Sequence, residues 1–73
     1  MNRTEQMRSL AVAETQRFLE EHDLAGPAEL TRVSGVSGAD LLGLSSDELS
    51  SKIRRAPFAA RKVAAARDAF LNA

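Results

Sequence analysis

The sequence contains no cysteine, tryptophan or tyrosine, and its 73 residues include only three phenylalanines, two prolines and four glycines. Without cysteine, neither a disulfide nor a thiolate metal site can stabilise so short a chain. No stretch approaches the ~20 apolar residues that a membrane span requires, and the polar N-terminus lacks the apolar centre of a signal peptide. We therefore expect a soluble, cytoplasmic chain whose stability comes from an ordinary hydrophobic core.

The residues available for that core are mostly alanine, leucine and valine, and hydrophobic residues make up 44% of the chain. A domain of this size buries only ~60% of the surface that its unfolded chain exposes, so its stability should be modest. Alanine lets helices approach closely and leucine fills the space between them. This composition favours one compact all-α domain of short helices.

Helix signals recur along the chain, whereas strand signals are absent. Apolar residues repeat at spacings of three and four, as on one face of an amphipathic helix. Pro27 and Pro57 stand where a first helical residue is expected, and the Ser37–Asp40 and Ser45–Glu48 pairs have capping-box spacing. These signals predict five helices: residues 9–22, residues 28–33, one turn ending at residue 42, a helix after residue 45 that carries Leu49 and Ile53 inward, and a long last helix from residue 57 with Ala59, Val63, Ala66 and Phe70 on one face.

The domain is predicted to occupy residues 9–73, with the polar residues 1–8 as a flexible N-terminal extension. Within it, four leucines are too many for a short exposed segment and are expected to point into the core: Leu41, Leu42, Leu44 and Leu49. Leu42→Ala is expected to cost about 2–5 kcal/mol of stability. Gly38 is predicted at a corner where a side chain would be crowded or the backbone needs unusual angles.

The charges divide along the chain although they sum to zero. Residues 1–51 contain nine acids and four bases, a net charge of −5, and residues 52–73 contain six bases and one acid, a net charge of +5. One interpretation is two solvated helix faces that happen to differ in sign. The other is that opposite poles attract copies of the chain head to tail.

Residues 36–49, VSGADLLGLSSDEL, resemble the central signature of the sterile alpha motif (SAM) family. In that signature a β-branched residue and a glycine precede a Leu-Leu pair, another leucine, and a Ser or Thr that caps a helix with an acid and a leucine. Residues 15–24, 27–33 and 58–63 resemble the family's first, second and fifth helices, so the resemblance covers about residues 12–71. The chain differs where the family often has tryptophan, here Phe18, and where it usually has a Gly-Ile pair and a later glycine, here Lys52-Ile53-Arg54-Arg55-Ala56-Pro57.

This resemblance implies a compact five-helix bundle with a long C-terminal helix that serves as a protein–protein interaction module. Many SAM domains dock an acidic surface of their middle helices onto the basic N-terminal end of the fifth helix of the next domain. Here the corresponding acidic residues, which we call the middle-helix acids, are Asp40, Asp47 and Glu48. The corresponding basic surface, which we call the basic end, consists of Arg54, Arg55, Phe58, Arg61 and Lys62. The partner would be a second copy or another SAM-like domain, in a closed oligomer or an open polymer, with Phe58 either an apolar anchor of the contact or packed inward beside Ala59.

Two other classes of function are open to the sequence. The basic end could instead bind an RNA stem-loop, and residues 33–38 loosely resemble the glycine-rich hairpin that contacts DNA phosphates, but zero net charge and the lack of Tyr and Trp count against nucleic acid. Enzyme activity is the weakest interpretation, since His22 is the only histidine and the serines are explained by caps and turns. We expect no catalytic residue, metal, cofactor, small-molecule substrate or membrane partner.

Overall fold

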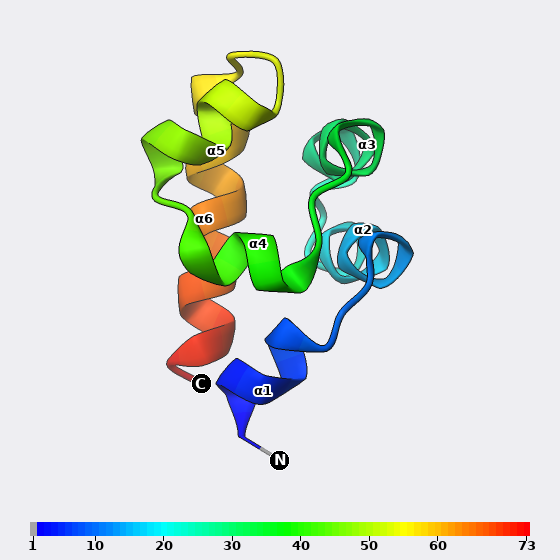
Figure 1. Cartoon of the computed structure of the whole chain (residues 1–73), viewed down its shortest axis with the longest axis vertical. Coiled ribbons are helices and arrows are strands. Elements are labelled where there is room, and N and C mark those ends of the chain that lie inside the picture. The colour runs from blue at the N-terminus through cyan, green and yellow to red at the C-terminus, as the bar shows by residue number, and fades with distance from the viewer. Residues whose placement is uncertain (1) are drawn as a thin grey trace.

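The computed structural model describes residues 2–73, and within that range the chain forms six α-helices and no strand (Figure 1). The all-α class is confirmed, whereas the expected number of helices is one too low. The helices are α1 (Arg3–Arg8), α2 (Val12–Glu21), α3 (Ala25–Ser34), α4 (Gly38–Gly43), α5 (Ser46–Lys52) and α6 (Pro57–Leu71). None of the helices in residues 2–73 combines the length and the apolar character needed to cross a membrane.

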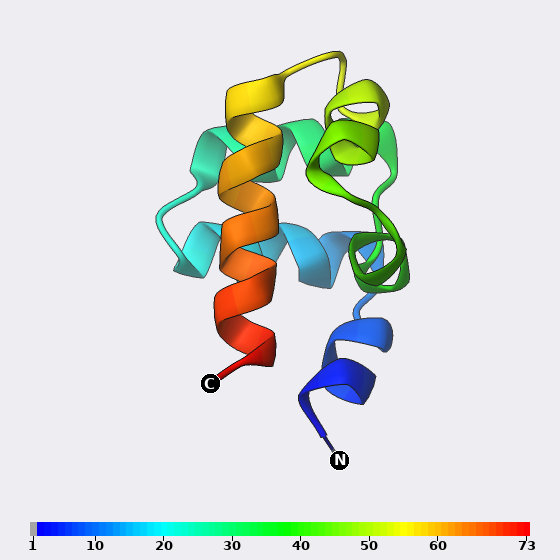
Figure 2. The same ribbon diagram turned by 90° about the vertical axis from the view of Figure 1, so that its left-hand side faces the viewer.

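The molecule measures 33 × 20 × 19 Å, and α6 is its longest helix. It runs along most of the longest dimension and contacts α1, α3, α4 and α5 (Figures 1 and 2). The helices α2 and α3 form a second packed pair, and α1 packs against α4. As a result, the first turn of α6 lies beside α5 at one end of the molecule, and its last turn lies near α1 at the other.

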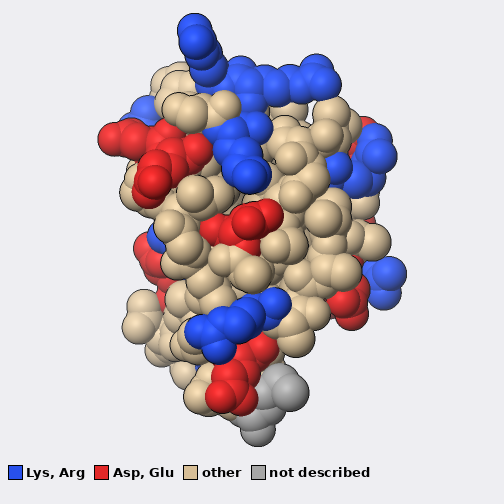
Figure 3. Space-filling view, viewed as in Figure 1, with Lys and Arg blue, Asp and Glu red and all other residues tan. Residues whose placement is uncertain are grey.

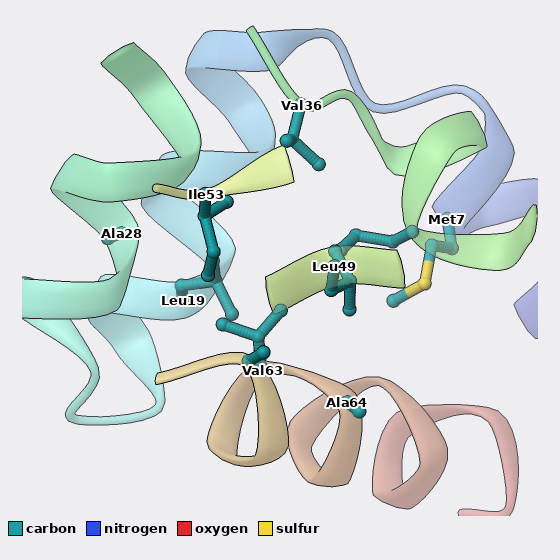
Figure 4. Packing of buried hydrophobic residues seen from close by; sticks show 10 residues of the cluster. Met7, Leu19, Ala28, Val36, Leu49, Ile53, Val63 and Ala64 are labelled. Atoms are coloured by element: carbon teal, nitrogen blue, oxygen red, sulfur yellow. The ribbon is translucent and has the colours of Figure 1, made fainter. Parts of the chain in front are cut away.

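Ten buried apolar residues, contributed by every helix and two of the connections, form the core. Figure 4 shows Leu19, Ile53 and Val63 pointing toward one interior space from three separate segments. The predicted burial of Leu49 and Ile53 is confirmed, since neither has any exposed surface. The remaining members of the core are Met7, Ala28, Val36, Leu41, Ala60 and Ala64.

Of the four leucines predicted to point into the core, Leu41 and Leu49 are fully buried, as expected. Leu42 and Leu44 pack against the edge of the core and are only half-buried. Successive residues of a helix point about 100° apart, so a short helix such as α4 can aim only one of two adjacent leucines at the centre. The large cost of truncation expected at Leu42 therefore belongs to Leu41.

Residues 2–8 form a capped helix and not the flexible extension that was predicted for residues 1–8, of which Met1 lies outside the described residues. Asn2 Oδ1 accepts a hydrogen bond from the Glu5 N–H at 2.8 Å and caps α1. Met7, on the inner side of this helix, has no exposed surface. A single buried methionine in a polar stretch creates no hydrophobic periodicity, so the sequence pattern does not predict α1.

Several helix boundaries also differ from expectation. The first long helix begins at Val12 rather than Ser9, and Pro27 is the third residue of α3 instead of its first. Because the first four N–H groups of a helix have no partner within it, proline is tolerated there too. On α6, the buried face includes Ala60 and Ala64 as well as the predicted Val63, since α6 is covered by neighbours on more than one side.

Candidate protein–protein interface

The basic end is built on the connection between α5 and α6. The chain leaves α5 at Ile53, reverses through three residues and enters α6 with Pro57 as its first helical residue, as predicted. Arg54 and Arg55 make this reversal in the left-handed region, at φ 63° and φ 54°. Left-handed backbone costs an ordinary residue about 1–2 kcal/mol, so a glycine would be the more stable choice at either position.

All five residues of the basic end are exposed. Phe58 has 74% of its surface exposed, so the structure turns it outward and not inward beside Ala59. Arg61 follows Phe58 by about one helical turn, and its guanidinium lies 5.0 Å from the centre of the Phe58 ring. This distance is within the range of a cation–π contact. Phe58 therefore projects from the basic end as an apolar side chain flanked by positive charge.

Among residues 2–73, no acidic side chain forms an ion pair with a residue of the basic end. The two ion pairs found within residues 2–73 are Glu29–Arg32 and Arg67–Asp68. Lys and Arg side chains gather at the end of the molecule that carries the α5–α6 connection (Figure 3). The N-terminal end of α6, which is the positive end of the helix dipole, adds to the positive potential of the basic end.

One base of the C-terminal region has a structural role instead. Arg67 lies on α6 with 13% of its side chain exposed. Its Nη1 donates to the Leu41 carbonyl at 2.8 Å and to the Leu44 carbonyl, which satisfies the end of α4. Arg67 therefore holds α4 against α6, and it is not part of a free basic surface.

The middle-helix acids are partly used in capping. Asp40 Oδ2 accepts from the Ser37 N–H at 3.1 Å, and Glu48 Oε1 accepts from the Ser45 N–H at 3.0 Å, which confirms both predicted capping boxes. The hydrogen bonds from Ser45, first its backbone N–H and then its side chain, lower the pKa of Glu48. Asp47 is exposed in the same turn.

Two of these acids also lie close to the basic end. The seven-residue helix α5 carries Asp47 and Glu48 in its first turn and is only about 10 Å long. Figure 3 shows acidic side chains beside the Lys and Arg cluster at the same end of the molecule. The two halves of opposite charge are therefore less separated in space than they are in the sequence.

A groove of about 330 Å³ lies between α1, α2 and α6, at the end of α6 opposite the basic end. Its apolar lining consists of Leu10, Phe18 and Phe70, and the two phenylalanine rings meet edge to face at 5.4 Å. Glu14, Arg17 and Glu21 from α2 and Gln6 from α1 complete the lining. No pattern in the sequence indicates this groove, because α1 was not expected and Phe70 was expected on the same face of its helix as Val63.

Two further charged or polar groups border the groove. The Arg3 guanidinium lies 4.8 Å from the centre of the Phe70 ring, and the ring of His22 lies 4.4 Å from that of Phe18. His22 follows α2 directly and donates its Nδ1 proton to the Phe18 carbonyl at 2.8 Å, so it contacts the end of its own helix. Within residues 2–73, no three His, Asp or Glu side chains gather closely enough to hold a metal ion.

Neither a protein-family model, nor a curated protein sequence, nor a solved structure matches the chain.

Proposed function

We propose that this chain is a SAM-like interaction module that self-associates head to tail, with the basic end as one of its two contact surfaces. The observation that carries the proposal is the exposure of Phe58 inside an unpaired basic cluster. Aromatic and arginine side chains dominate the binding energy of protein interfaces, particularly where apolar surface is ringed by polar groups. An aromatic residue that is three-quarters exposed gains most by being covered in a complex.

The second surface is negatively charged in this proposal. The resemblance to SAM domains points to the middle-helix acids, and the glutamates that line the groove between α1, α2 and α6 are the other candidate. Because the two surfaces differ, the contact is heterologous, and it builds an open chain of copies unless its rotation closes a ring. A different SAM-like domain with a suitable acidic surface is the alternative partner.

Complementary charges mainly raise the rate of encounter and set the orientation, while a desolvated apolar centre holds the complex together. The charges of the basic end are exposed and would be screened over ~8 Å at physiological ionic strength. Association should therefore weaken as salt is raised.

The test is the solution mass measured by light scattering over a concentration series, at low and at high salt. We expect the mass to grow with concentration, to fall with salt, and to stay that of one chain in Arg61→Glu. The matched control is Arg8→Glu, which changes an exposed base of α1 by the same charge and should associate as the wild type does. A wild-type monomer at every concentration would refute self-association.

The alternative is nucleic-acid binding through the same basic end, which the unpaired arginines favour. Two features count against it: Phe58 is the cluster's only aromatic residue for stacking, and Asp47 and Glu48 place negative charge nearby. A monomeric wild type that binds an RNA stem-loop, with affinity lost in Arg61→Glu, would establish this alternative.

A further inference from the structure

We propose that the groove between α1, α2 and α6 receives Phe58 of a second copy, so that copies join end to end along α6. This inference rests on the proposed self-association and names its acceptor surface. It places the apolar centre of the contact in the groove, and not on the middle-helix acids.

The chemistry of the groove suits an aromatic side chain. Phe18 and Phe70 are both half-buried, and with Leu10 they leave apolar surface open to the groove. A volume of about 330 Å³ is within the range of pockets that enclose a bound group. A third phenylalanine inserted there could meet the two rings in the tilted or edge-to-face geometry that aromatic pairs prefer. Phe18 and Phe70 of one copy and Phe58 of the next would then form one aromatic cluster.

The charges on the two surfaces are complementary where they flank the apolar part. Glu14 and Glu21 lie two helical turns apart along α2 and line the groove on either side of Arg17. Arg61 and Lys62 follow Phe58 by three and four residues, which places them on the same side of α6. A docked Phe58 would bring these two bases toward the two glutamates.

Two bases of the acceptor copy also face the groove and must be accommodated. Arg17 lies between the glutamates, and Arg3 already covers the Phe70 ring as Arg61 covers Phe58. Arg3 is the exposed first residue of α1, so its side chain can rotate away when another aromatic group reaches Phe70. Docking of Phe58 against Phe70 would therefore require only a rotation of the Arg3 side chain.

The geometry of α6 makes this contact intermolecular. Phe58 is in its first turn and Phe70 in its last, so the two lie about 18 Å apart along a single rigid helix (Figures 1 and 2). Phe58 therefore cannot reach the groove of its own copy. Each copy carries one projecting residue and one groove at opposite ends, which is the arrangement that propagates head to tail.

The middle-helix acids differ from the acids of the groove in position and not in capping. Asp40 and Glu48 each use a carboxylate oxygen to cap their own helix, and Glu14 of the groove does the same for α2. Asp47 and Glu48 also lie within one short helix of the basic end, where they attract the bases of their own copy as well as those of a neighbour.

The experiment compares two acid-to-lysine variants that make the same change of charge. Glu21→Lys alters the groove, and Asp47→Lys alters the middle-helix acids; both residues are exposed. We expect Glu21→Lys and Phe58→Ala each to raise the dissociation constant at least ~10-fold, and Asp47→Lys to leave it within ~2-fold. Circular dichroism melts establish that each variant is folded.

Mixing supplies the decisive measurement. Phe58→Ala keeps an intact groove and Glu21→Lys keeps an intact Phe58. Mixed in equal amounts, at a concentration where each variant alone is a monomer, the two should form a complex of two chains and grow no further. If Asp47→Lys abolishes association while Glu21→Lys does not, the head-to-tail function stands and the groove is the wrong acceptor. If the mixture stays monomeric, the pairing of Phe58 with the groove is likewise wrong. A wild type that never associates would end both proposals.

Discussion

Gly38 begins α4 where that helix meets the end of α1. Its N–H donates to the Leu10 carbonyl at 2.9 Å, and a Cβ on this residue would lie 1.8 Å from the carbonyl oxygen of Met7. The sequence predicted a crowded corner at this glycine, and crowding rather than a left-handed backbone is what the structure has there.

We predict that Gly38→Ala destabilises the fold by at least about 1–3 kcal/mol, because the obstructing atom belongs to the backbone and cannot rotate away. The measurement is urea unfolding followed by circular dichroism. Gly43→Ala in the same helix is the control, since its Cβ meets nothing within 4 Å and alanine favours the helix. Equal midpoints for the two variants would show that α1 does not pack against α4 in this way.

At Arg54 and Arg55, stability and the proposed function favour different residues: glycine suits the backbone, and arginine supplies charge to the basic end. Both occupy the left-handed region without being glycine. We predict that Arg54→Gly or Arg55→Gly raises the free energy of unfolding by about 0.5–1 kcal/mol, the relief of strain less the entropy that glycine adds to the unfolded chain. The same variants should associate more weakly because they remove a positive charge from the basic end.

The control for both effects is Arg54→Ala, which removes the same charge but keeps a Cβ. Its association should weaken as much as that of Arg54→Gly, without the gain in stability. A glycine variant no more stable than the alanine variant would contradict the left-handed geometry of this connection.

At the scale of helices, the sequence predicted best what depends on neighbouring residues. The capping boxes of α4 and α5 were found because Ser and the acid three residues later satisfy each other's N–H groups locally. The start of α6 at Pro57 follows from the same kind of signal. The helix α1 was missed because a partner distant in sequence, α4, stabilises it through one buried side chain, Met7.

The same division applies to the candidate interface. The basic end is contiguous in sequence, so its charges were visible there, although the outward direction of Phe58 was not. The first turn of α6 has positions on every side, and which of them meets α5 depends on the path through Arg54 and Arg55. The groove combines Leu10, Phe18 and Phe70 from three separated segments, and no local pattern brings these together.

The capping box of α5 also predicts a dependence on pH. The folded state lowers the pKa of Glu48, so this group contributes stability above its ordinary pKa of ~4.3 and loses it as the pH falls through the lower folded value. We predict that the melting temperature of Glu48→Gln falls less than that of the wild type between pH 7 and pH 3. Glu29, whose pKa is lowered by Arg32, keeps some acid sensitivity in both proteins.

Asp47→Asn serves as the control for this series, since Asp47 shares the turn but accepts no such capping hydrogen bond in the described chain. It should retain the acid sensitivity of the wild type. The same loss of melting temperature in Glu48→Gln as in the wild type would mean that the box contributes nothing in solution.

At the scale of the whole molecule, α1 and the last turn of α6 lie at the same end of the helical bundle (Figure 1). The helix α1 contacts both α4 and α6, and its Met7 belongs to the one core that all six helices share. Arg67 joins α6 to the end of α4 through hydrogen bonds to the Leu41 and Leu44 carbonyls. The groove exists only because α1 is held in place, so the segment that resembled a tail is required for both the fold and the proposed acceptor.

This arrangement predicts that the N-terminal helix carries a large share of the stability. A chain of 73 residues is expected to unfold with a free energy of about 4–11 kcal/mol, and truncating a buried methionine to alanine costs about 2–5 kcal/mol. Met7→Ala should therefore lower the urea midpoint sharply, whereas the volume-conserving Met7→Leu should cost less than about 1.5 kcal/mol. Arg8→Ala, at an exposed position of the same helix, controls for any effect of helix propensity. If Met7→Ala and Arg8→Ala unfold at the same urea concentration, residues 3–8 do not belong to the core, and the groove loses one of its walls.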